Sequence, residues 1–528
     1  MTANDIPAPA PPQPPQPTPR PDSGLDPGRW SLLSDWLNPI VVREVQQALK
    51  GRAFVLSVMA ALIVVIAIAL VVASDFNPAS SGRNAFDAGL ATLVPLLLFV
   101  TPMSAYQSMR HELKVGMVDQ LLLSELRPRR IIMGKLAAAM VQFVLYVSVI
   151  APLLATSYLL RGVDMPMIGI SLLFALLFCV VATAFAVSSA AQGMMPAMQG
   201  LSNLAVAVGL AMGCMGLVGY IGSGEYARDI AWLLRSSELS TVVSSMIIGG
   251  LASCTMSGLT AATFLAHAHE NKSSGFRVFL LILVAVVFGW VALFIDPAHR
   301  GDVAAAATVA LMIGGALFAI FMVTEQERLS PRVQAHVPQN AALALLVAPL
   351  LPGRQRGMLC FLLFCVLLGG IAALTWPVAG TRAFVGEARR FALFVAAYAV
   401  IYLSLAKWIR GRLPASLVGN HLARFSVPVL LFLFCILPVL LDVVIKNRVR
   451  GWHPGHCMNP FWTIERFAFG SRGSESWLLD CLLIAAIGMV LLQVPALIEG
   501  VREVLRASAR RRQYVQDKAA GTEAAVLD

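Results

Sequence analysis

The sequence is short of charge. Only 13% of its 528 residues are Asp, Glu, Lys or Arg, whereas 58% are hydrophobic, and the mean hydropathy is +0.75. Soluble domains carry about 25% charged residues, so this chain lacks the polar surface that a water-soluble protein of its size needs. We therefore expect much of its surface to face lipid. The net charge of +11 is then better explained by loops anchored to anionic headgroups than by nucleic-acid binding.

Motifs for metal, disulfide and nucleotide chemistry are also lacking. No CxxC pair occurs among the eight cysteines, and seven of them lie in apolar runs, which excludes a disulfide framework and a cysteine zinc site. The histidine-containing segments 267–270 and 453–457 lack a complete ligand set, so we interpret them as loop residues and predict no metal site. No GxxxxGK[ST] phosphate loop occurs, so we expect no ATP site in this chain.

Long apolar runs are what the sequence does contain. A helix needs about 20 apolar residues to cross the ~30 Å hydrocarbon layer. Twelve runs reach or approach this length: 53–73, 86–107, 136–160, 167–190, 200–221, 239–266, 278–295, 303–323, 357–379, 391–406, 426–445 and 477–498. We predict an all-α polytopic membrane protein with about 12 transmembrane helices, within a range of 10–12. Two shorter apolar segments, 226–237 and 340–352, are predicted to be interfacial or re-entrant.

The distribution of basic residues predicts an orientation. With twelve crossings and both termini in the cytoplasm, the tails and inward loops hold 27 of the 40 Lys and Arg residues, as the positive-inside rule requires. Loop 446–476 fits least well, because it places five of them outside. We expect a multi-pass protein of the cytoplasmic (inner) membrane of a prokaryote, which is its plasma membrane.

Ionisable side chains are nearly absent from the runs themselves. Asp87, Asp442 and Asp480 are the only acidic residues in the twelve runs, each near an end, and no Lys, Arg or His occurs there. Intramembrane charges usually mark a coupling site for ions. Their scarcity argues against a proton- or sodium-driven carrier and favours a process that is driven from outside the membrane.

Residues 36–52 predict an amphipathic helix at the membrane interface. Asn38 is a good N-cap, and Pro39 suits the first helical position. One face is apolar and the other is polar and cationic, as in helices that lie on membranes. The apolar face comprises Leu37, Val41, Val45, Ala48 and Leu49, and the polar face Arg43, Gln46, Gln47 and Lys50.

A second charged segment, 111–135, separates the second and third runs. Leu113, Met117 and Leu121 follow helical spacing, the Arg-Pro-Arg-Arg sequence at 127–130 is predicted to end that helix, and Lys135 to open the next span. A cytoplasmic loop of this length, partly helical and densely charged, indicates a contact with another protein.

From residue 36 to about 191 the chain resembles the permease subunits of type-2 ABC exporters. That family opens with an interfacial elbow helix, whose motif is matched by Asn38, Pro39, Arg43 and Glu44. The family's coupling helix follows the second span, and it is matched in order and spacing by Glu112, Gly116, Asp119, Leu121, Leu122, Leu123, Arg129, Arg130, Gly134 and Lys135. The chain departs from the family at Met117 and Val118, where a small hydroxyl residue is usual, and at Glu125, where proline is common.

The resemblance implies a function and a set of partners. The chain would be a permease and not an enzyme, and would export a substrate that the sequence does not identify. It would contain no cofactor itself, and ATP with Mg would be hydrolysed by a separate cytoplasmic ABC ATPase subunit. A second permease unit would come from homodimerisation or from a similar chain. The residues implied in docking the ATPase are Glu112, Gly116, Asp119, Leu121, Arg129, Arg130 and Lys135.

The predicted organisation follows from these segments. It comprises a disordered Pro-rich cytoplasmic tail (1–29, with ten of the 30 prolines), an elbow helix (30–52), a six-span permease core (53–266), a C-terminal six-span region (267–500) and a basic cytoplasmic tail (501–528). Segment 324–356 is the positional counterpart of the coupling loop in the second half, but 267–277 is too short for a second elbow. We therefore prefer a divergent extension, with a degenerate inverted or tandem repeat as the alternative.

Two other functions remain open. A membrane-embedded transferase for lipid or glycan substrates would need reactive side chains at one interface, and segment 453–457 with Glu465 is its only candidate. A non-transporting membrane scaffold is the third option. Glycines also recur along the fifth run, and we expect them to allow close helix packing rather than to line a substrate path. They are Gly209, Gly213, Gly216, Gly219 and Gly222.

Overall fold

The structure is a computed structural model that describes most of the chain. The described residues are 39–74, 78–117, 128–192, 196–265, 271, 273–325, 327, 329–375, 382–412, 420–446, 456–468 and 477–527. Within these ranges the chain is helical and has no strand, which confirms the all-α prediction. The predicted Pro-rich tail 1–29 and the predicted site residues Asn38, Asp119 and Leu121 lie outside the described residues.

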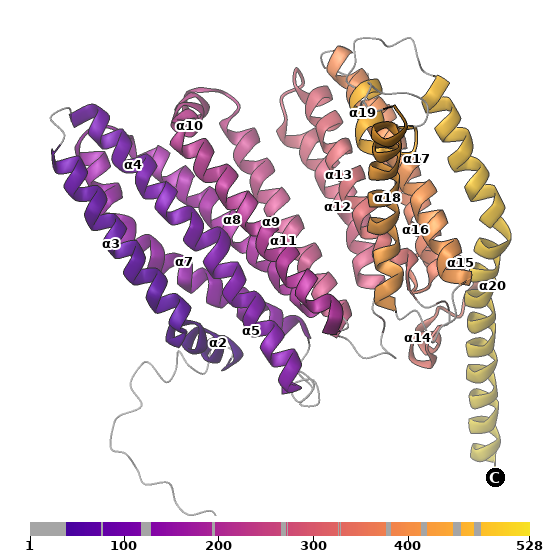
Figure 1. Cartoon of the computed structure of the whole chain (residues 1–528). Coiled ribbons are helices and arrows are strands. Elements are labelled where there is room, and N and C mark those ends of the chain that lie inside the picture. The colour runs from indigo at the N-terminus through magenta and orange to yellow at the C-terminus, as the bar shows by residue number, and fades with distance from the viewer. Residues whose placement is uncertain are drawn as a thin grey trace, which may run out of the picture.

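Two groups of helices stand side by side (Figure 1). The first contains α2 (Pro39–Lys50), α3 (Arg52–Ser74), α4 (Pro78–Pro95), the π-helical turn η1 (Leu96–Val100), α5 (Thr101–Val115), α7 (Pro128–Leu159), α8 (Met165–Ala191), α9 (Pro196–Gly222), α10 (Glu225–Arg235) and α11 (Leu239–Leu265). The second contains α12 (Ser274–Phe294), α13 (Arg300–Val323), α14 (Pro331–His336), α15 (Ala341–Val347), η2 (Ala348–Leu350), α16 (Arg354–Thr375), α17 (Arg382–Arg412), α18 (Asn420–Lys446), α19 (Pro460–Ala468) and α20 (Trp477–Leu527).

Eleven helical segments among the described residues are long and apolar enough to cross a membrane. They coincide with eleven of the twelve predicted runs, and α4, η1 and α5 together form the second. The remaining run, 426–445, lies in α18, whose described apolar part is Val429–Val444 and is shorter than the other spans. The chain is therefore a multi-pass membrane protein by the length and composition of its helices, but the predicted count of twelve is not confirmed.

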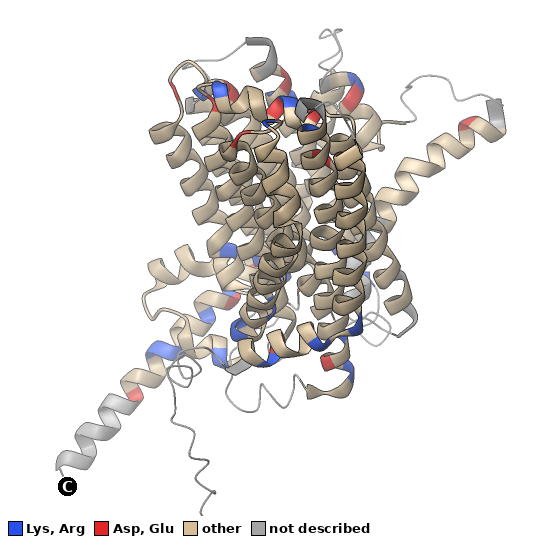
Figure 2. Ribbon diagram, turned by 90° about the vertical axis from the view of Figure 1, so that its left-hand side faces the viewer, with Lys and Arg blue, Asp and Glu red and all other residues tan. Residues whose placement is uncertain are grey.

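The short helices lie at the two ends of the long ones. The helices α2 and α14 lie at the lower end in Figure 1, whereas α10 and α19 lie at the upper end. Segments 226–237 and 340–352 form α10 and α15 with η2, short helices as predicted. Charged residues gather towards both ends of the helices, and few occur along the ribbon between them (Figure 2). This distribution is that of helices whose middle parts face hydrocarbon.

The helices of each group are held together mainly by an apolar cluster of buried side chains within that group. Buried side chains of α3, η1, α7 and α8 form one cluster, and those of α12, α13, α16 and α17 form the largest. Contacts between the groups include a hydrogen bond of 3.1 Å from Trp290 Nε1 to Ser244 Oγ and the paired rings of Phe264 and Phe321. By contrast, α3 carries side chains such as Leu56 and Leu70 that are more than two-thirds exposed, which suits a lipid-facing helix.

One sequence-based expectation was wrong, and another lies outside the described residues. The helix predicted to end at the Arg-Pro-Arg-Arg sequence falls in segment 118–127, which the structure does not describe, and α7 begins at Pro128, a residue that suits the first helical position. The glycines of the fifth run do not pack against another helix within the described chain. A Cβ added at Gly209, Gly213, Gly216, Gly219 or Gly222 would meet nothing within 4 Å.

Candidate functional site: a buried ionic cluster joining three helices

Three helix ends meet at the lower end of the first group. The amphipathic helix α2 packs against the beginning of α7, and the last turn of α5 lies beside both. Gly116 ends α5 with φ of +73°, and its N–H bonds to the carbonyls of Glu112 and Leu113. The left-handed conformation favours glycine, so the sequence places the end of α5 one turn after Glu112.

Four charged side chains from these helices form a closed cluster. Lys135 Nζ lies 3.0 Å from Glu44 Oε2 and 3.1 Å from Glu112 Oε2. Arg43 Nη2 lies 3.0 Å from Glu44 Oε1 and 3.1 Å from Glu112 Oε1. Each carboxylate therefore bridges the same two cations. Lys135 Nζ also donates a hydrogen bond of 2.8 Å to Ser108 Oγ, one turn before Glu112 on α5.

The cluster is buried. The side chains of Lys135, Glu112 and Glu44 are 1%, 2% and 4% exposed, and only Arg43 reaches solvent, with 38%. Such a cluster adds little net stability compared with apolar packing, but removal of one member leaves an uncompensated buried charge. The main role of the cluster is therefore to fix the relative position of α2, α5 and α7, and its net contribution to the free energy of folding is small.

The charge balance also sets the ionisation of Glu44, which lies on α2 outside the membrane-spanning segments. Burial opposes the charged form of this carboxyl. The charge of Lys135 and the hydrogen bonds from Lys135 and Arg43 outweigh that effect and hold the pKa of Glu44 below its usual value. Glu44 is therefore an anion at neutral pH, as the cluster requires.

A cavity of about 490 Å³ adjoins the cluster. It lies among α2, α3, α5 and α7, and Glu44 and Lys135 line it on one side. Gln142 and Tyr146 of α7 line it farther along that helix. The Tyr146 hydroxyl lies 2.7 Å from Ser57 Oγ of α3, so polar contacts continue from the cluster towards the spans.

The structure separates the predicted site residues into two sets. Arg43, Glu44, Glu112 and Lys135 pair with one another, so Glu112 and Lys135 do not lie on the surface of this chain. Arg129 and Arg130 are exposed in the first turn of α7. Pro39 begins α2, and Gly116 forms the turn after α5. Whether any of them contacts an ATPase stays a prediction.

A second set of buried charges was not anticipated. Arg277 at the beginning of α12 is fully buried, lies 2.6 Å from Glu325 Oε2, and donates to the carbonyls of Pro349 (3.0 Å) and Gly353 (3.1 Å). Arg356 at the beginning of α16 is also fully buried, and donates to the carbonyl of Gly500 and to Glu503 of α20, at 3.0 Å each.

These two arginines hold together the segment that precedes α16. By residue type alone, these two arginines cannot be distinguished from the exposed basic residues that commonly flank membrane spans. The one signal that could have distinguished them is their position directly at helix beginnings beside the glycine- and proline-containing turn 349–353. They give the predicted counterpart of the coupling loop, 324–356, a fixed structure instead of an open loop.

The described residues offer little reactive chemistry. Among them, no group of three or more His, Cys, Asp or Glu side chains could hold a metal ion. His456, which the sequence placed in the segment considered for a transferase, is fully buried. Its Nε2 lies 3.2 Å from Asp442 Oδ2, and its ring is 4.5 Å from that of Trp462. A side chain so enclosed holds α18 and α19 together and is out of reach of a substrate.

Comparison with known proteins adds no relative: no protein-family model, no curated protein and no solved structure matches this chain. The functional argument therefore stands on the sequence motifs and on the geometry above.

Proposed function

We propose that this chain is the transmembrane permease subunit of an ATP-binding cassette exporter, and that a separate cytoplasmic subunit binds and hydrolyses ATP with Mg²⁺. On this proposal the lower end in Figure 1, where α2 and the end of α20 lie, faces the cytoplasm of a prokaryotic cell. Both termini are then cytoplasmic. A second permease unit, from another copy or a similar chain, completes the transporter.

One observation carries the proposal. The resemblance to exporter permeases rests on two motifs that are separated by some 70 residues, and two residues from each motif meet in one cluster. Arg43 and Glu44 belong to the elbow motif, and Glu112 and Lys135 to the coupling motif. A chance similarity in sequence gives no reason for these particular residues to meet.

The cluster also suits the mechanical role that a permease needs. Lys135 and Glu112 lie on the two helices that flank segment 118–127, so a force applied to that segment acts on α5 and α7 together. Closure of an ATPase dimer would then shift these helices between two packings, as in other transporters that respond to rigid-body motion.

A π-helical turn lies farther along the same path. The turn η1 (Leu96–Val100) interrupts the second span above α5, and Thr101 Oγ1 donates a hydrogen bond of 2.9 Å to the carbonyl of Leu96. Pro102 follows directly and provides no N–H to the helix. Such turns are frequent at functional sites, and this one, with the proline beside it, would allow α5 to tilt while α4 stays in place.

The experiment is co-purification of the full chain with any nucleotide-binding subunit encoded beside its gene, followed by measurement of ATP turnover. We expect a complex from the wild type, and loss of the ATPase from the Arg129→Glu, Arg130→Glu double variant. Arg502→Glu on α20 is the matched control, because it reverses an exposed charge outside the coupling segment. The proposal is wrong if no nucleotide-binding subunit associates with the wild type, or if the double variant binds and turns over ATP like the control.

A further inference from the structure

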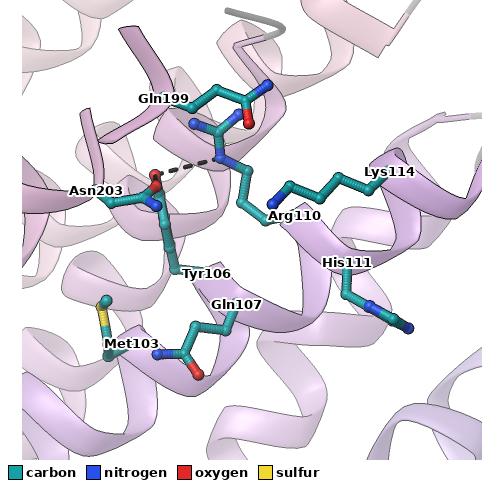
Figure 3. Close-up of a pocket in the computed structure, with 8 residues that line it drawn as sticks. All are labelled: Met103, Tyr106, Gln107, Arg110, His111, Lys114, Gln199 and Asn203. Atoms are coloured by element: carbon teal, nitrogen blue, oxygen red, sulfur yellow. Dashed lines mark hydrogen bonds between the residues drawn. The ribbon is translucent and has the colours of Figure 1, made fainter. Parts of the chain in front are cut away.

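A small cavity lies between α5 and α9, next to the ionic cluster but separate from it (Figure 3). Its volume is about 230 Å³. Residues of one face of α5 and two residues of α9 line it: Met103, Tyr106, Gln107, Arg110, His111, Lys114, Gln199 and Asn203. No carboxylate lines it among the described residues, whereas one arginine, one lysine and one histidine do.

Arg110 is the central feature of this cavity. Arg110 is 8% exposed, and its Nη2 atom is buried without a hydrogen-bond partner. The guanidinium is held in place from one side only, because Nε donates a bond of 3.3 Å to the Tyr106 hydroxyl. That hydroxyl in turn donates a bond of 2.5 Å to Asn203 Oδ1.

The nearest carboxylate along α5 cannot neutralise this charge. Glu112 is committed to Lys135 and Arg43 in the ionic cluster. A buried guanidinium without a counter-charge is costly, and proteins keep one mainly where it is paired or binds a ligand. Arg110 is thus oriented by Tyr106 and Asn203, lines the cavity, and keeps one buried N–H group without a partner.

We infer that this cavity binds a phosphate-type oxyanion, with Arg110 as the principal contact. A guanidinium offers paired N–H donors that match the oxygens of phosphate. Lys114 and His111 are exposed beside it and add donors near the opening, and Gln107 adds an amide. The inference does not depend on the proposed transport function.

The position of the cavity relative to the membrane indicates which molecules could supply the anion. Arg110 follows the end of the apolar run 86–107 by three residues, about 4.5 Å along the helix. This is the depth of lipid headgroups, so the phosphate of an anionic phospholipid and a soluble phosphate can both arrive there. The volume suits a phosphate group and excludes acyl chains.

Two measurements on the purified full chain separate these sources. Native mass spectrometry counts the phosphatidylglycerol and phosphatidylcholine molecules that stay bound, and thermal unfolding in detergent compares inorganic phosphate with chloride at equal ionic strength. We expect Arg110→Gln to weaken binding of one of these ligands by about tenfold or more, as for loss of a charge-assisted contact. Arg502→Gln, which removes an exposed charge from α20, serves as the control and should bind like the wild type.

Each result of these measurements identifies one source of the anion or overturns the inference. Loss of retained phosphatidylglycerol in Arg110→Gln identifies a lipid phosphate, and loss of the phosphate-induced stabilisation identifies a soluble anion. If both responses equal those of the control, the inference is overturned. Lys114→Gln guards against misfolding of the first variant, because its side chain is exposed. It should unfold like the wild type without ligand yet bind a few-fold more weakly, and unchanged affinity in this variant also overturns the inference.

Discussion

The ionic cluster of the first helix group and the buried arginines of the second group contain the same kinds of residue near helix ends. Their side chains nevertheless have different structural roles. Lys135 neutralises two carboxylates that come from other helices. Arg356 mainly donates hydrogen bonds to backbone carbonyls, those of Pro352, Gly500 and Glu327. The first kind of residue fixes helix positions through charge, and the second fixes a turn through hydrogen bonds. Their substitutions should therefore fail in different ways.

Loss of Lys135 should strongly destabilise the first helix group. In Lys135→Met, Glu44 and Glu112 share only Arg43, so we expect a loss of about 3–5 kcal/mol in the free energy of unfolding. The Lys135→Met, Glu112→Gln double variant should lose less than the sum of the single variants, because one charge of each sign is removed. Chemical unfolding in detergent measures these values, with the exposed Lys50→Met as the control. A loss no larger than that of the control contradicts the role of the cluster.

The lowered pKa of Glu44 predicts a dependence on pH. A carboxyl whose pKa is lower in the folded state binds protons more readily when unfolded, so its contribution is complete above the usual glutamate pKa and is lost as pH falls towards the folded value. The difference in melting temperature between the wild type and Glu44→Gln should accordingly be largest near neutral pH and shrink below about pH 4.5. A difference that stays constant from pH 7 to pH 3 would show that Glu44 does not act through its charge.

At the scale of helices, close approach of backbones sets limits that side-chain patterns do not reveal. Gly357 of α16 lies against α13, and a Cβ added there would be 2.3 Å from the carbonyl oxygen of Met322. That oxygen belongs to the backbone and cannot move aside. Gly369 of the same helix has open space around it. The two glycines look alike in sequence but have opposite tolerance.

This contrast gives a matched pair of variants. Gly357→Ala must separate α13 from α16, so we expect it to lower the melting temperature clearly or to prevent folding. Gly369→Ala should be neutral or stabilising by up to about 1 kcal/mol, because alanine favours a helix. Thermal unfolding of both proteins in the same detergent compares them directly, and equal melting temperatures would contradict the packing of α13 on α16.

The segment between α13 and α16 depends on Arg356. Removal of its guanidinium in Arg356→Gln breaks the hydrogen bonds that link α16 to the carbonyls of Glu327 and Gly500. We expect faster amide hydrogen exchange in residues 329–353 and readier proteolysis there, with little change in the first helix group. Arg354→Gln is the control, because Arg354 is partly exposed and its nearest carboxylate oxygen is 3.7 Å away. Equal exchange in the two variants would show that Arg356 does not hold this segment.

At the scale of the whole molecule, the spans were the most predictable feature. Eleven of twelve predicted runs coincide with apolar helices because the length of an apolar run is a local property of the sequence. The short helices α10 and α15 were recognised for the same reason. The glycines of α9 misled the interpretation, because a row of small residues allows close packing but does not supply the neighbour.

The candidate site was only partly predictable. The motifs identified Arg43 and Glu44 as elbow-helix residues, and Glu112 and Lys135 as ATPase contacts, without relating the two sets. Their mutual pairing joins residues up to 91 positions apart, and no periodicity in the sequence reports such a contact. The same limit hid Arg277, which meets carbonyls more than 70 positions away.

The last helix, α20, connects the upper end of the second group to the region below it without a break. Its 51 residues correspond to a rod of about 75 Å. From Val504 to Arg512 it contacts α14, α15 and the segment between them, which act as a pivot. The 15 residues that follow Arg512 would form an arm of about 22 Å, so a tilt of about 5° at the pivot displaces the tip by about 2 Å. A fluorescent label near Leu527 would therefore act as a pointer that magnifies small rotations of the membrane helices.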